Sequence, residues 1–164
     1  MTLTDDLLRA NEQYREGFSA SELQIRPLQQ LAILTCMDSR YTAQGVLGLD
    51  LGDAHVIRNA GGRVTEDVVR SLSISAALLG TRACVIIHHT DCGLSGRTDE
   101  ELRTRVADAS GARAPFGFLG FEDLDQSVRD DVAALRAIPY FPPEYEVLGF
   151  TYDVRSGTLA SVED

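Results

Sequence analysis

The feature that most constrains the fold is a set of three short apolar runs without the alternating polar pattern of a half-exposed strand. They span residues 31–35, 55–57 and 83–87. Continuous apolar runs of this length are typical of strands in a parallel sheet that is covered on both faces. A strongly apolar helix is predicted over residues 65–79, between the second and third runs. This alternation predicts an α/β fold with a parallel sheet and right-handed crossovers.

The rest of the chain completes this prediction. Helices are also predicted at residues 4–17, 98–108 and 122–137. A closing edge strand is predicted at 145–152, with a turn at Ser156-Gly157 that makes a short hairpin. The first helix has so thin an apolar stripe that we expect it to pack on another subunit. We therefore expect a single domain over residues 1–164. Its mostly parallel central sheet has about four to five strands flanked by helices, with an N-terminal helical arm.

Charge and cysteine content narrow the classes of function. The 164 residues hold 25 acidic side chains against 15 cationic ones, all arginine, for a net charge of −10. Such a surface repels phosphates, so we expect neither nucleic acid nor a membrane as partner. The acidic start around Asp5 is unlike a secretory signal and predicts a cytoplasmic protein. In that reducing compartment the three cysteines are expected to be metal ligands, a nucleophile or core residues.

Polar clusters follow the first and third apolar runs. Cys36, Asp38 and Arg40 follow the first, and His89 and Cys92 follow the third. Because the carboxyl ends of parallel strands meet at one edge of a sheet, these side chains are expected to lie close together. Two thiolates and one imidazole suit Zn²⁺, and three protein ligands leave the fourth position that a catalytic zinc site needs.

The polar residues around these clusters are interpreted separately. Asp38 and Arg40 are expected to form a bidentate pair. Beside a metal, Asp38 could either bind the ion and close its open position, or be held by Arg40 as a hydrogen-bond acceptor for water. For Asp91 a role beside the site and a solvated loop position remain open. We expect His88 to be a hydrogen-bonded structural residue and Cys84 to be a core residue.

The motifs also resemble a known family. The residues that carry the resemblance are Cys36-x-Asp38-x-Arg40, Arg58-Asn59-Ala60-Gly61-Gly62 and His89-x-x-Cys92-Gly93. Together they resemble the signature of the β-class carbonic anhydrases. The resemblance implies that Cys36, His89 and Cys92 bind Zn²⁺ and that Asp38 and Arg40 form the catalytic dyad. It further implies an enzyme for the reversible hydration of carbon dioxide to bicarbonate and a proton, by attack of zinc-bound hydroxide. The expected assembly is a homodimer or a dimer-based oligomer.

Three other functions were weighed against this one. The same zinc site could hydrolyse carbonyl sulfide or carbon disulfide, because these carbon dioxide analogues offer the same kind of electrophilic carbon. Nucleophilic chemistry at Cys36, as in a phosphatase-type loop, requires an arginine six positions after the cysteine. This chain has Thr42 there, so that function is not expected. A non-catalytic zinc or redox-sensing module, in which Cys36 and Cys92 oxidise and release the metal, is disfavoured by the open ligand position and the dyad.

Overall fold

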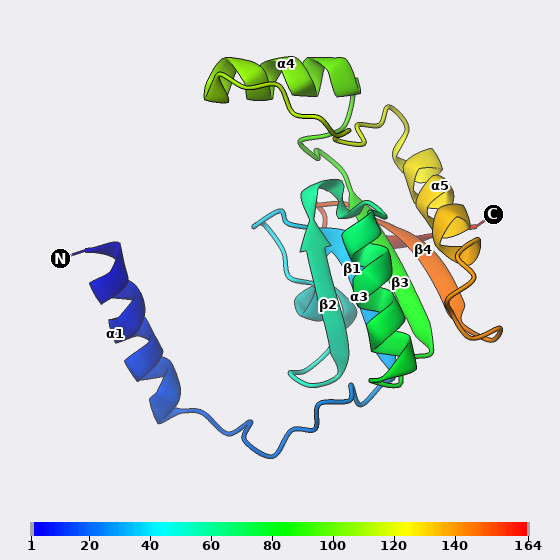
Figure 1. Cartoon of the computed structure of the whole chain (residues 1–164). Coiled ribbons are helices and arrows are strands. Elements are labelled where there is room, and N and C mark those ends of the chain that lie inside the picture. The colour runs from blue at the N-terminus through cyan, green and yellow to red at the C-terminus, as the bar shows by residue number, and fades with distance from the viewer. Residues whose placement is uncertain (1, 164) are drawn as a thin grey trace.

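The computed structural model of the chain describes residues 2–163 and is built on a five-stranded sheet of order β2-β1-β3-β4-β5 (Figure 1). The strands are β1 (Leu31–Cys36), β2 (Ala54–Asn59), β3 (Ala83–His89), β4 (Glu146–Tyr152) and β5 (Leu159–Val162). β1 pairs in parallel with β2 and β3, β3 pairs in parallel with β4, and only β5 is antiparallel. The predicted mostly parallel sheet is confirmed, and β1 and β3 are neighbours within it.

The helices begin where a short polar side chain caps the first turn. They are α1 (Leu3–Glu16), α2 (Ala43–Leu47), α3 (Glu66–Ala77), α4 (Asp99–Ser110) and α5 (Leu124–Arg136), with a 3-10 turn η1 (Ala60–Gly62). Each α-helix follows a residue whose side chain accepts a backbone N–H of the first turn: Thr2, Thr42, Thr65, Thr98 and Asp123. Such caps satisfy N–H groups that have no partner inside the helix.

The core lies on both faces of the sheet. Alternate residues of β1 and β3 face α3 and α5, which lie together on one side of the sheet (Figure 1). This layer includes Ala32, Leu34, Leu72, Cys84, Ile86, Val128 and Leu135. The opposite layer, with Ile33, Val85 and Ile87, packs on Ala43 of α2. Cys84 is fully buried, which confirms it as a core residue.

The sequence prediction was wrong about which strands lie at the edges. The run at 55–57 belongs to β2, an edge strand with no buried residue, because it has a sheet neighbour on one side alone. β4 is an interior strand instead of the closing one. The chain turns at Gly157, where φ is +74°, and returns as β5, which forms the other edge. The five-residue helix α2 was not predicted, since it is too short to show a helical period.

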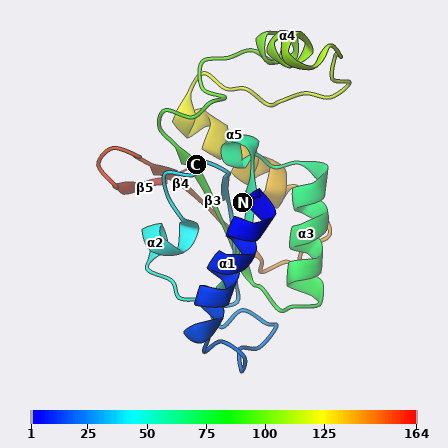
Figure 2. The same ribbon diagram turned by 90° about the vertical axis from the view of Figure 1, so that its left-hand side faces the viewer.

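The N-terminal helix stands apart from the sheet in Figure 1, and in Figure 2, seen from its own side, it lies in front of the rest of the chain. α1 has no buried residue, and it exposes Leu3, Leu7, Leu8 and Tyr14. Within residues 2–163, no helix is long and apolar enough to cross a membrane. The apolar side chains of α1 are therefore without cover in the isolated chain.

Candidate metal centre

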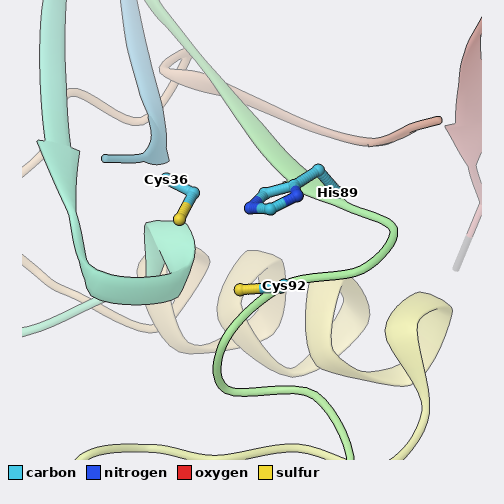
Figure 3. A group of neighbouring side chains, drawn as sticks. All are labelled: Cys36, His89 and Cys92. Carbon is cyan, nitrogen blue, oxygen red and sulfur yellow. The ribbon is translucent and has the colours of Figure 1, made fainter. Parts of the chain in front are cut away.

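The ends of β1 and β3 bring the three predicted metal ligands together. Cys36 is the last residue of β1, His89 is the last of β3, and Cys92 follows in the next turn. Their donor atoms all lie within 4.8 Å of one another, and all three residues are buried. The two sulfur atoms and the imidazole ring face a common space (Figure 3).

A glycine turn packs tightly against this junction. Gly62, in η1, has φ of +71°, a conformation that residues with a Cβ rarely adopt. A Cβ at this position would lie 3.0 Å from the Cys36 backbone nitrogen and 3.1 Å from the Ile87 carbonyl oxygen. Only glycine therefore lets η1 pack so closely against the ends of β1 and β3. This close packing holds the backbone of Cys36 in place.

The imidazole of His89 is oriented by its own backbone. Nδ1 lies 2.8 Å from the Thr90 carbonyl oxygen, which can only accept, so Nδ1 carries the proton and Nε2 keeps its lone pair. Nε2 is buried and has no hydrogen-bond partner within residues 2–163. A buried polar atom without a partner costs free energy, unless a ligand satisfies it. Metal-binding histidines show this arrangement, with one nitrogen bonded to a carbonyl and the other free for the ion.

The two buried thiols of the centre influence each other's ionisation. The closeness of the Cys92 thiol to the Cys36 sulfur lowers the pKa of Cys36 and raises the pKa of Cys92. Burial opposes ionisation of both thiols. One thiolate and one imidazole nitrogen therefore already face each other, and a divalent cation would favour ionisation of the second thiol. The donor set and its spacing fit a zinc ion.

Asp38 is held beside this group by Arg40, as the spacing of the two residues predicts. Arg40 Nε lies 2.9 Å from Asp38 Oδ1, and Arg40 NH2 lies 2.7 Å from Asp38 Oδ2. These hydrogen bonds lower the pKa of Asp38 to about 2, so the carboxylate is ionised at neutral pH. Its Oδ2 lies 3.9 Å from His89 Nε2. Arg40 thus holds Asp38 in the geometry that the role of hydrogen-bond acceptor requires.

Comparison with known proteins places the chain in a family. The family model described as carbonic anhydrase matches residues 31–109. The chain is 40% identical to β-carbonic anhydrase 1 of Mycobacterium tuberculosis over 162 residues, which cover 99% of both proteins. The chain belongs to the β-carbonic anhydrase family. The resemblance seen in the sequence motifs is thereby confirmed.

Two further relatives define the range of the family around this chain. The crystal structure of the carbonic anhydrase from Streptococcus mutans superposes with a TM-score of 0.93, at 42% identity and with 99% of each chain covered. A carbon disulfide hydrolase of Saccharolobus solfataricus is 32% identical over 170 residues, covering 88% of this chain and 83% of that protein. Both enzyme types therefore occur among the relatives of this β-carbonic anhydrase family member.

Two arginines that the sequence reasoning did not assign support the centre. Arg58 donates from Nε to the Cys36 carbonyl oxygen at 2.8 Å and from NH2 to the Asp38 carbonyl oxygen. Arg63 donates from Nε to Asp131 on α5 at 2.7 Å, in a pair that is almost fully buried. A buried guanidinium without a counter-charge would be costly, and the Asp131 carboxylate offsets that cost.

A buried histidine joins the second of these pairs. His88 Nδ1 lies 2.7 Å from Ser127 Oγ, and its Nε2 lies 3.2 Å from both the Gly62 carbonyl oxygen and Asp131 Oδ2. His88 is thus the hydrogen-bonded structural residue that was predicted. The sequence did contain a signal for its partners: Ser127 and Asp131 are polar residues on the otherwise apolar stripe of α5.

Proposed function

We propose that Cys36, His89 and Cys92 bind one Zn²⁺ ion and that the chain catalyses the reversible hydration of carbon dioxide to bicarbonate and a proton. The observation that carries this proposal is the buried Nε2 of His89, which has no hydrogen-bond partner in the described part of the chain and faces two cysteine sulfurs at ligand spacing. Membership of the β-carbonic anhydrase family supports it. When bound, zinc lowers the pKa of a water ligand and so supplies a nucleophile near neutral pH.

Asp38 and Arg40 are proposed as the catalytic dyad. Arg40 keeps the Asp38 carboxylate ionised and fixes both of its oxygens, so that the carboxylate offers a hydrogen-bond acceptor in one direction. A fixed acceptor beside the reacting water orients that water toward carbon dioxide, and orientation of this kind contributes substantially to rate. Because its pKa is depressed to about 2, Asp38 acts as an acceptor and not as a proton store at neutral pH.

The assembly that fits this chain is a homodimer or a dimer-based oligomer. Support comes from α1, whose apolar side chains have no cover, and from β2, whose outer edge has no neighbouring strand among residues 2–163. A second copy that packs against both would bury these surfaces. Sedimentation velocity at micromolar concentration is expected to give a dimer or a multiple of it. A single species with the mass of one chain would contradict this proposal.

Carbon disulfide hydrolysis is the second candidate, because several relatives are carbon disulfide hydrolases. The one from Saccharolobus solfataricus is 32% identical to this chain. The deciding experiment is stopped-flow carbon dioxide hydration on protein of known zinc content, with carbonyl sulfide and carbon disulfide assayed in parallel. We expect carbon dioxide to be the preferred substrate, with kcat/KM above about 10⁴ M⁻¹ s⁻¹. Rapid hydrolysis of carbon disulfide with negligible hydration of carbon dioxide would assign the chain to the second function.

A further inference from the structure

Asp91 has a backbone conformation that calls for an explanation. Its φ is +56°, in the left-handed region, and it lies directly before Cys92. Among residues with a side chain, aspartate adopts this conformation more readily than most, and such residues are often found at functional sites. Here the conformation turns two acceptors of one residue toward the same guanidinium. Asp91 Oδ2 lies 2.7 Å from Arg40 NH1, and the Asp91 carbonyl oxygen lies 2.9 Å from Arg40 NH2.

These contacts complete the hydrogen bonding of the Arg40 guanidinium. Its Nε and NH2 bind the two oxygens of Asp38, while NH1 and NH2 bind Asp91, so all three nitrogens of the guanidinium have acceptors. Asp38 and Arg40 lie two residues apart on the same loop. Without a further contact, a movement of this loop would carry both side chains with it. Asp91 comes from the loop after β3, 51 residues along the chain from Arg40. It therefore ties the pair to a second, independent part of the fold.

We propose that Asp91 is a positioning residue of the catalytic dyad, which fixes Arg40 and through it the Asp38 carboxylate. The proposal rests on the proposed function of that dyad. An ordinary exposed ion pair would contribute little, and the Asp91 side chain is 61% exposed. Asp91 differs from such a pair in two respects, because its carbonyl oxygen also binds Arg40 and because its backbone is held in an unfavourable conformation.

The first test measures the mobility of Arg40 directly. Asp91→Asn keeps the size of the side chain and tolerates the left-handed conformation, but it removes the charge. Glu100→Gln is the matched control, since Glu100 of α4 forms an exposed ion pair at 2.6 Å with Arg113, which follows that helix. The readout is hydrogen exchange of the Arg40 Nε–H signal in ¹⁵N NMR spectra, assigned by its loss in Arg40→Lys.

We expect this exchange to be at least about tenfold faster in Asp91→Asn and unchanged in Glu100→Gln. The charged hydrogen bond from Arg40 NH1 to Asp91 is lost, so the guanidinium is held less firmly and its Nε–H bond to Asp38 opens more often. Unchanged exchange in Asp91→Asn would overturn the proposal, as would equal acceleration in both variants. The measurement requires neither turnover nor a particular substrate. It therefore gives a result even if the proposed carbon dioxide hydration is wrong.

The second test asks whether Asp91 acts through Asp38. In the wild-type background, Asp91→Asn is expected to lower kcat about tenfold with zinc content unchanged, because the carboxylate is less well oriented. In an Asp38→Ala background the same substitution is expected to change kcat by less than about twofold, since residues that act as a unit are not additive. Equal reductions in both backgrounds, or no reduction in the wild type, would show that Asp91 does not position the dyad.

Discussion

Cys36→Ser is expected to abolish zinc binding and, with it, catalysis. Serine keeps its hydroxyl proton at neutral pH, so the site loses one of its two thiolates and retains one sulfur and one imidazole donor. Zinc affinity depends on deprotonated ligands of suitable softness. The variant should therefore hold less than about 0.1 zinc per chain after dialysis, against about one for the wild type. Inductively coupled plasma mass spectrometry on protein of measured concentration gives these ratios.

Cys84→Ala is the control for this experiment. Cys84 is also a buried cysteine, but it lies in the core layer beneath α3 and α5, away from the three clustered donors. The control should keep its zinc and lose only a little stability, because it removes one small apolar side chain. Full zinc content in Cys36→Ser would remove Cys36 from the ligand set. Loss of zinc from Cys84→Ala as well would point to a general folding defect.

Asp38→Ala is expected to separate catalysis from metal binding. The variant keeps all three donor residues, so its zinc content should equal that of the wild type. Its kcat/KM for carbon dioxide should fall by about 10²–10³-fold, because the oriented acceptor beside the reacting water is gone. Stopped-flow hydration assays between pH 6 and 9 measure this loss. The reduction should be similar across this range, since the pKa of Asp38 lies at about 2 and the carboxylate does not titrate there.

The matched variant for this prediction is Glu100→Ala, which breaks the exposed ion pair between Glu100 of α4 and Arg113. It removes a carboxylate that binds an arginine, as Asp38→Ala does, but at a place remote from the clustered donors. Its activity should stay within about twofold of the wild type, as for most surface substitutions. An Asp38→Ala protein that is as active as Glu100→Ala would exclude the dyad from the mechanism.

The parts of the fold that the sequence predicted are those governed by local pattern. The continuous apolar runs of β1 and β3 indicated interior parallel strands, and their polar C-terminal residues were therefore expected at one edge. The same reasoning misplaced β2, because a run as short as His55-Val56-Ile57 looks the same in an interior strand and in an edge strand. The turn at Gly157 that joins β4 to β5 is local and was predicted, but β5 has only four residues, too few to show that it and not β4 closes the sheet.

The candidate site divides in the same way. The spacing of Asp38 and Arg40 predicted their pair, because both residues lie on one loop. The contact between Arg40 and Asp91 joins segments that are distant in sequence, so the role of Asp91 stayed open until the two loops were seen together. The buried Arg63–Asp131 pair was likewise missed, although an acid on the apolar stripe of α5 indicates a buried partner.

Zinc K-edge X-ray absorption of the purified protein tests the central claim most directly, because it reports the ligands of the bound ion. We expect one zinc ion per chain with two sulfur ligands at about 2.3 Å and one imidazole nitrogen at about 2.0–2.1 Å. The fourth ligand should be a light atom, because the position that these three residues leave open is taken by an oxygen atom of solvent or of a carboxylate. A first shell without sulfur, or one made of four sulfurs, would contradict the assignment of Cys36, His89 and Cys92 as the metal ligands.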